Sequence, residues 1–440
     1  MTSYKYLGIV SIFLIFILIL PLTHGNSLGI EQNPPAFYSY ASTFQRTASI
    51  DNNKKINGLK IQKIENLSIN VDEYENFGTG QWMIQNKTAL FFHTDHAALK
   101  IDKDTFEITR MSFDDESKIW VDNLTYSHEL NVLIGGFFQG NSWYIAVLNP
   151  DTMEVIQIVP GYGFTDSSST MGTIVTDQKV FYLNTIDENC NIMSLTVGDE
   201  PEIVYSIASQ SITSGSLSGE FLYLLGHTVS GQEAMNSMYC IHTKSKKLSW
   251  KHDFPTVHQR GIMYHRPICT SNGILTIRTD VGSRCLTIQC LNSDNGNILW
   301  NQQLPYAIDP NTLLNPLVSA DKKEISMYIE AYQRWDSAYI PKIIVLSSKD
   351  GSLVREYSLT KNLQTITGIG DNIIVTTKKL SKKPGWIAVI NRSTGQIITT
   401  EYVLEGSILS YPIIEDEKIW LLIQNQADEI AIVELLIEVE

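Results

Sequence analysis

Short runs of alternating hydrophobic and polar residues fill most of the chain. Clear examples are "KVFYLNTI" at 179–186, "EFLYLLGH" at 220–227 and "ILTIRTD" at 274–280. Turn residues separate these runs, and long stretches with a 3.6-residue period are missing. Alternation with a period of two is typical of strands that bury one face. The pattern therefore predicts an all-β chain.

One turn recurs along the sequence, each time between two apolar runs. Its clearest copies are "LNSDNGNILW" at 291–300, "LSSKDGSLVR" at 346–355 and "VINRSTGQII" at 389–398. Other copies begin at Lys103 ("KDTFEI"), Pro150 ("PDTMEV") and Lys244 ("KSKKLS"), and a degenerate copy ("VGDEPEIV") begins at Val197. A repeat of roughly 50 residues accommodates four short strands, which is the content of one propeller blade. A blade cannot bury both of its faces alone, so several blades must pack side by side in a ring.

The two ends of the chain complete this count. The last segment, from Ser410, holds about three strands and has no outer strand, whereas "GLKIQKIENLSI" at 58–69 alternates but has no unit of its own. We expect 58–69 to supply the missing strand, which removes free sheet edges at the closure. The prediction is a closed β-propeller of four-stranded blades over residues 58–440, with eight blades favoured and seven as the alternative. Residues 26–57 are polar and aperiodic, which predicts an extended lead-in.

Glycine occupies the same place in three copies of the turn, at Gly296, Gly351 and Gly395. Glycine adopts a positive φ at little cost, so we expect this conformation there. Phe106 and Met153 stand at the corresponding place in two other copies. For these two turns we expect a different geometry.

The N-terminal segment has the features of an export signal. Lys5 is followed by an apolar run from Leu7 to Leu22 and then by small and polar residues up to Gly25. This order predicts a cleaved signal peptide over residues 1–25, with an uncleaved anchor helix as the alternative. The expected location is secreted or extracytoplasmic, and the membrane is reached only through this segment if it stays uncleaved.

The charge balance narrows the class of partners. The chain has 33 basic and 47 acidic residues, for a formal net charge of −14. An acidic surface repels phosphate backbones and anionic lipid headgroups. We therefore expect no nucleic-acid partner and no binding to an anionic membrane surface.

Two copies of the repeat end in tryptophan: "HTKSKKLSW" at Trp250 and "NSDNGNILW" at Trp300. This sequence pattern resembles the repeat of the PQQ-like, quinoprotein alcohol dehydrogenase-like β-propeller family. In that family such a tryptophan packs between neighbouring blades, so the resemblance implies an inter-blade structural role for both residues. Two later copies lack it and have Tyr357 and Tyr402 two and three places further on.

The catalytic members of that family bind a quinone and a calcium ion, and they use a vicinal cysteine pair, a stacking tryptophan and acidic groups. This sequence has no adjacent cysteines, and none of those site residues can be matched. The resemblance therefore implies a non-catalytic member. We assign no catalytic, cofactor-binding or metal residue and expect no cofactor.

Two groups of reactive side chains have simpler explanations than chemistry. "FFHTDHAAL" holds His93, Asp95 and His96, but two residues three apart on a strand point to opposite faces, so a solvated turn is favoured over a metal site. Buried, inert thiols are favoured for the cysteines, with a disulfide among the last three as the alternative. The cysteines are Cys190, Cys240, Cys269, Cys285 and Cys290.

Two classes of function remain. The first is an exported binding or scaffolding module that contacts another protein or an extracellular polymer through its rim loops. The aromatic loop "IEAYQRWDSAYIP" offers Tyr332, Trp335 and Tyr339 as partner contacts, although packing over a neighbouring blade explains them equally well. The second is a propeller enzyme, a quinone-dependent dehydrogenase or a hydrolase with its site in the central channel. Sequons at Asn66, Asn86 and Asn123 predict glycosylation if the chain enters a glycosylating secretory path.

Overall fold

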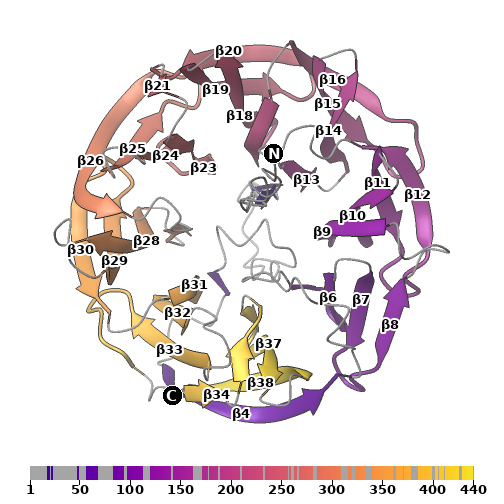
Figure 1. Cartoon of the computed structure of the whole chain (residues 1–440), viewed down its shortest axis with the longest axis vertical. Helices are drawn as coiled ribbons and strands as arrows, with labels where there is room; N and C mark the ends of the chain where they lie inside the picture. Colours follow the sequence, from indigo (N-terminus) through magenta and orange to yellow (C-terminus); the bar gives the residue numbers. More distant parts are fainter. Residues whose placement is uncertain are drawn as a thin grey trace, which may run out of the picture.

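The computed structural model is an eight-bladed β-propeller, and every regular element in the part of the chain that it describes is a strand (Figure 1). The structure describes residues 17–19, 21–22, 47–48, 56–67, 83–93, 97–111, 119–139, 142–161, 171–176, 178–186, 189–208, 211–230, 233–255, 257–258, 262–264, 267–280, 285–308, 316–319, 323–332, 339–359, 363–369, 371–377, 385–398, 402–404, 406–410, 412–425 and 429–439. The all-β prediction and the favoured blade count are confirmed, and the seven-blade alternative is wrong. Within the described ranges there is no helix of the length and hydropathy that a membrane crossing needs.

The first four blades each contain four antiparallel strands, in chain order from the axis outward. Blade 1 consists of β5 (Ile84–Gln85), β6 (Ala89–His93), β7 (Ala98–Asp102) and β8 (Ile108–Met111). Blade 2 consists of β9 (Ile119–Ser127), β10 (Val132–Gln139), β11 (Ser142–Leu148) and β12 (Val155–Pro160). Blade 3 consists of β13 (Met171–Val175), β14 (Val180–Ile186), β15 (Asn189–Leu195) and β16 (Glu202–Ala208). Blade 4 consists of β17 (Ser211–Ser218), β18 (Phe221–Ser230), β19 (Glu233–His242) and β20 (Lys247–Asp253), and β21 (Val257–His258) pairs with β19.

The other blades follow the same plan, with local additions. Blade 5 consists of β22 (Ile262–Tyr264) and β23 (Ile268–Cys269), then β24 (Ile274–Asp280), β25 (Cys285–Leu291) and β26 (Ile298–Ile308). Blade 6 consists of β27 (Leu317–Val318), β28 (Glu324–Tyr332), β29 (Tyr339–Ser347) and β30 (Leu353–Ser358). Blade 7 consists of β31 (Leu363–Ile369), β32 (Asn372–Thr377), β33 (Gly385–Asn391) and β34 (Tyr402–Leu404). Three short N-terminal strands, β1 (Ile17–Ile19), β2 (Pro21–Leu22) and β3 (Thr47–Ala48), run parallel to β13, β17 and β31.

Blade 8 joins the two ends of the chain. Its inner strands are β35 (Gly406–Ile408), β36 (Ile413–Glu415), β37 (Lys418–Asn425) and β38 (Ile430–Val439). Its outer strand is β4 (Ile56–Asn66), which pairs antiparallel with β38 from Ile56↔Val439 to Asn66↔Ala431 (Figure 1). The predicted closure by the segment after residue 57 is therefore confirmed, and the strand begins two residues earlier than the predicted boundary.

The recurring turn has one geometry in both its glycine and its non-glycine copies. The backbone φ is +71° at Gly296 and +72° at Gly351, and it is +61° at Phe106 and +63° at Met153. The amide of Phe106 bonds to the carbonyl of Asp102 at 2.9 Å, as that of Gly296 does to Asn292 at 2.9 Å. The expectation of a different geometry at Phe106 and Met153 was wrong. Left-handed backbone costs a non-glycine residue about 1–2 kcal/mol, and burial of both side chains offsets that cost, since only 8% of Phe106 and 3% of Met153 is exposed.

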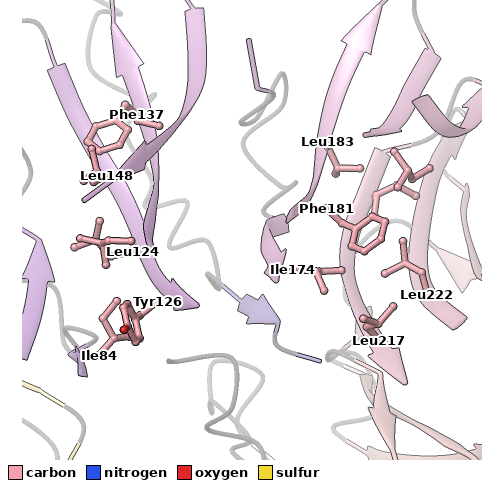
Figure 2. Close-up of a cluster of buried hydrophobic side chains, with 14 of the residues drawn as sticks. Ile84, Leu124, Tyr126, Phe137, Leu148, Ile174, Phe181, Leu183, Leu217 and Leu222 are labelled. Atoms are coloured by element: carbon pink, nitrogen blue, oxygen red, sulfur yellow. The ribbon is translucent and has the colours of Figure 1, made fainter. Parts of the chain in front are cut away.

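Hydrophobic side chains fill the space between the blades. One cluster runs from Ile84 in blade 1 through Leu124 and Ile174 to Leu217 in blade 4 (Figure 2). Each buried aliphatic side chain of this kind contributes about 1.5–3 kcal/mol of transfer free energy. The packing therefore holds each blade to the next, although no blade has a closed core of its own.

Small polar side chains and large rings also take part in the contacts between blades. On the inner side, Thr173 Oγ1 meets Thr125 Oγ1 at 3.4 Å and Ser216 Oγ donates to the Pro267 carbonyl at 2.8 Å. On the outer strands, the junctions include large rings such as Trp250 and Trp300.

Candidate functional site

The central hairpins of blades 4 and 6 are the longest in the described ring. Both strands have ten residues in β18–β19 and nine residues in β28–β29, whereas the hairpin of blade 1 has five in each. The outer strand β26 also continues beyond blade 5 and pairs with β28 through Ala307↔Tyr332 and Ile308↔Ala331. We call the hairpins β18–β19 and β28–β29, together with the far end of β26, the raised rim.

The structure brings two of the three predicted partner contacts together. Tyr332 and Tyr339 are directly opposite each other, as the last cross-strand pair of the β28–β29 hairpin. Tyr332 is also paired with Ala307 of β26, so its backbone is held from both sides. Trp335 lies outside the described residues, between these two tyrosines in the chain, and the structure describes only the backbone of Tyr332 and Tyr339.

A buried hydrogen-bond pair fixes the base of this hairpin to blade 7. The hydroxyl of Tyr328 donates to Glu330 Oε1 at 2.9 Å and accepts from the amide of Leu363 at 3.1 Å. Burial raises the pKa of Tyr328, and the neighbouring Glu330 carboxylate raises it further. The tyrosine therefore stays neutral and acts as a fixed donor, which makes the support for the tip rigid.

Polar side chains hold the blade 4 part of the raised rim in a similar way. The carboxylate of Asp253 accepts from Ser237 Oγ at 2.6 Å and from Lys251 Nζ at 2.7 Å. Burial acts to raise the pKa of Asp253, but the hydrogen bonds from Lys251 and Ser237 outweigh it and the pKa is lowered. Further along the hairpin, His227 Nδ1 lies 2.9 Å from Asn236 Oδ1. These contacts tie β19 to β20 and β18 to β19, below the hairpin tip.

Trp250 and Trp300 lie at two successive blade junctions. The Trp250 indole donates to the carbonyl of Ser293 at 2.8 Å, in the turn of blade 5. A Cβ built at Gly296 would lie 2.5 Å from the Trp250 ring, and one at Gly351 would lie 2.4 Å from the Trp300 ring. Each ring therefore covers the glycine of the next blade's turn.

Tyr357 has the same arrangement at the following junction. Comparing only the last residue of each copy of the motif does not reveal it. Its hydroxyl donates to the carbonyl of Arg392 at 2.6 Å, and a Cβ at Gly395 would clash with its ring. Tyr357 stands two residues beyond the place of the tryptophans, and residues two apart on a strand share a face. That spacing is the signal that could have found it. The side chain of Tyr402 lies outside the described residues.

Four of the five cysteines are buried thiols outside any disulfide: Cys190, Cys240, Cys269 and Cys290. Burial raises the pKa of Cys190 to about 11 and that of Cys240 and Cys290 to about 12. Cys269 and Cys290 are on β23 and β25, and β24 between them separates the two by more than a disulfide spans. Since neither of the two is in a disulfide, the alternative of a bond that uses either residue is wrong. The side chain of Cys285 lies outside the description.

The remaining candidates are separated in the fold. Among the described residues there is no group of three or more His, Cys, Asp or Glu side chains that could hold a metal ion. His93 ends β6, and Asp95 and His96 lie outside the description. Of the sequons, Asn66 is exposed with its amide 3.1 Å from Glu429 Oε2, and Asn86 is 7% exposed with its Oδ1 accepting from the Ala89 amide. Asn123 is opposite Gly136 on β9, and its side chain is not described.

Comparisons with known proteins support the propeller fold but identify no family. No protein-family profile matches the chain, and no curated protein matches it in sequence. A solved structure of the Dos1 propeller matches with a TM-score of 0.57 and 10% identity, over 85% of this chain and 95% of that one. A structure of a prolyl endopeptidase matches with a TM-score of 0.47 and 10% identity, and the chain covers only 56% of its length. Prolyl oligopeptidase B from Galerina marginata matches with a TM-score of 0.46 and 12% identity, over 84% of this chain and 55% of that one.

Proposed function

We propose that this chain is an exported binding or scaffolding module that contacts its partner through the raised rim and catalyses no reaction. The observation that supports this most directly is the end of the β28–β29 hairpin, where Tyr332 pairs with Tyr339 and also with Ala307 of the neighbouring strand β26. A rigid scaffold that presents variable loops is a common arrangement for recognition. The partner is another protein or an extracellular polymer.

Tyr332, Trp335 and Tyr339 are the proposed contact residues. Tyrosine and tryptophan supply large contact areas and are enriched in the centres of interfaces. The fixed backbone at Tyr332 and Tyr339 favours this role, because little conformational entropy is then lost on binding. The net charge of −14 argues against nucleic acid as the partner.

The family and the route to the cell exterior are also part of the proposal. The turn with its inter-blade Trp250 and Trp300 supports membership of the PQQ-like repeat family as a non-catalytic relative. The apolar run from Leu7 to Leu22 supports export, with the leader either cleaved after residue 25 or retained as an anchor. Asn66, whose side chain is exposed, is the best of the glycan acceptors on the described surface.

The test starts from the secreted chain and uses cross-linking followed by mass spectrometry to identify what the rim contacts. The double variant Trp335→Ala, Tyr339→Ala should then lose that partner. The matched control is Trp143→Ala, which removes an aromatic residue that packs against Phe138 at the tip of the blade 2 hairpin. Loss of the partner in both variants, or in neither, would contradict the proposal.

The enzyme alternative has its own test. The purified chain should not reduce a dye in the presence of quinone, calcium and alcohol or sugar substrates above a heat-treated control. Dye reduction that a chelator abolishes would move the function to a quinone-dependent dehydrogenase.

A further inference from the structure

The outer strand of blade 2 has an unusual surface. β12 (Val155–Pro160) ends its sheet, so only β11 pairs with it. Its sequence, "VIQIVP", has no charged residue. The exposed fractions are 41% at Val155, 51% at Ile156 and 49% at Ile158. This strand thus combines a free backbone edge with three exposed aliphatic side chains.

Most other described outer strands of more than three residues are protected in a way that β12 is not. Charged residues occur on β4, β8, β16, β20 and β30, and charges on an edge strand prevent unwanted strand pairing. The uncharged β26 is covered by β28 only at Ala307 and Ile308, so its first part shares an open, uncharged edge with β12. What sets β12 apart is the group of acidic residues around its start.

The two ends of β12 have different surroundings. Asp151 and Glu154 precede the strand, and the Gln157 side chain bonds to the next blade's turn at Gly198 N and Asp199 O, at 2.9 and 2.8 Å. Glu200 follows in that turn. Three carboxylates therefore lie around the start of β12, with one cation, Lys100, whose Nζ donates to the Asp151 carbonyl at 2.7 Å. The only polar side chain of β12 itself is already hydrogen-bonded.

The other end of the edge is marked by Pro160. The amide of Gly161 still bonds to the Trp143 carbonyl of β11 at 3.1 Å. Because amides alternate in direction along a strand, the missing donor of Pro160 falls on the outward side, where it breaks no bond within the blade. The available edge therefore extends from the acidic start of β12 to Pro160.

We propose that the outer edge of β12 binds an extended peptide strand of a partner protein, apolar at alternate positions and basic at its C-terminal end. Strand addition gives affinity through main-chain hydrogen bonds and specificity through alternate side chains. An antiparallel strand continues the pattern of the blade and places its C-terminal end beside Asp151 and Glu154. This surface is separate from the raised rim, so the inference does not depend on the function proposed above.

A second copy of the chain fits this edge less well than a peptide. A stable interface buries about 800 Å² on each partner, which the edge of one six-residue strand does not provide. Two copies, each with a net charge of −14, also repel each other. A short basic strand avoids this repulsion and needs no contact beyond the edge itself.

The test measures fluorescence anisotropy of a labelled peptide, SVTVTVKK, with the full chain. We expect binding to the natural sequence, about tenfold weaker binding to Ile158→Lys, and unchanged binding to Leu299→Lys. Leu299 is the control because it is 48% exposed on β26, much like Ile158 at 49%. A peptide with proline at the central valine should not bind. Both lysine variants change exposed side chains, and their melting temperatures confirm that they fold.

Three results would overturn the inference. The first is no anisotropy change with the natural chain up to millimolar concentration. The second is equal weakening by Ile158→Lys and Leu299→Lys, which would show general electrostatic repulsion. The third is a dimer in sedimentation experiments that Ile158→Lys dissociates, which would make the edge a contact between copies.

Discussion

At the scale of single residues, the ring that fills a blade junction comes either from the preceding blade or from the turn itself. Where the turn has glycine, as at Gly296, Gly351 and Gly395, a ring from the preceding blade fills the space. Where the turn has Phe106, the aromatic ring comes from the turn itself and lies under Lys63 Nζ at 3.6 Å. The total volume at the junction is what matters, because interiors are close-packed. Either side of the junction can supply it.

The two tryptophans should respond differently to the loss of the indole nitrogen. The Trp250 indole has a hydrogen-bond partner, whereas the buried Trp300 Nε1 has none among the residues that the structure describes. Trp250→Phe should therefore cost about 1 kcal/mol more than Trp300→Phe in the free energy of unfolding. Trp→Ala at either place should cost about 3–5 kcal/mol. Denaturant unfolding measures all four values, and equal costs for the two phenylalanine variants would show that the hydrogen bond adds nothing.

The glycine of the turn should be intolerant of any side chain as long as the ring is present. In Gly351→Ala the new Cβ meets Trp300 at 2.4 Å and the φ of +72° is unfavourable for alanine. We expect a loss of about 2–4 kcal/mol, from the overpacking and the backbone strain together. Adding Trp300→Ala removes the clash, so the double variant should lose less than the sum of the single variants. Strict additivity in thermal unfolding would mean that ring and turn do not interact.

At the scale of elements, β4 is the strand whose position has the largest consequence. It contributes the buried residues Ile56 and Leu59 to a cluster with Val433 and Leu435. Its removal exposes the edge of β38 and the apolar face beneath it.

Deletion of residues 56–67 should therefore cause aggregation or cost several kcal/mol of stability. Deletion of residues 26–37 is the matched control, because it removes the same length without touching β3 or β4, and it should leave the melting temperature nearly unchanged. If the β4 deletion melts at the same temperature as the control, the closure contributes nothing to stability.

The sequence predicted the strands, the repeat and the closure because each depends on local alternation and on a turn with a fixed period. It did not predict Phe106 and Met153 in a left-handed conformation, because the packing that compensates their strain comes from another blade. It placed Tyr332 and Tyr339 in one loop, but the pairing of Tyr332 with Ala307 of β26 needs the third dimension. The exposed edge of β12 was also missed, since a single alternating run does not show which strand is outermost.

At the scale of the whole molecule, the seam between blade 8 and blade 1 is held by a charge pair as well as by packing. Lys103 Nζ forms an ion pair with the carboxylate of Glu415 and donates to the Asn86 carbonyl at 2.7 Å. Burial lowers the pKa of Lys103, although the charge of Glu415 opposes this shift. Across the same seam, Gln85 Nε2 donates to the Ile414 carbonyl at 3.4 Å. Polar contacts therefore join blade 8 to blade 1 at two places on this seam, through Lys103 and Glu415 and through Gln85 and Ile414.

Removing one partner of the Lys103–Glu415 pair should destabilise the fold more than removing both. Lys103→Met leaves the Glu415 carboxylate, whose side chain is 19% exposed, without its partner. We expect the single variant to lose about 3–5 kcal/mol, and the double variant Lys103→Met, Glu415→Leu to recover part of that loss. Chemical unfolding of the three proteins gives the coupling energy. A double variant that is less stable than the single one would show that the pair is a weak surface contact.

The pairing of Ile56 with Val439 sets an order of events during biosynthesis. β4 leaves the ribosome long before its partner β38 is made. Until β38 is available, β4 has no strand to pair with and the growing ring is an open arc with an unpaired edge. Contacts of such long sequence separation make folding slow. The open arc is therefore exposed to aggregation for as long as β38 is missing, and the ring closes only when that strand pairs with β4.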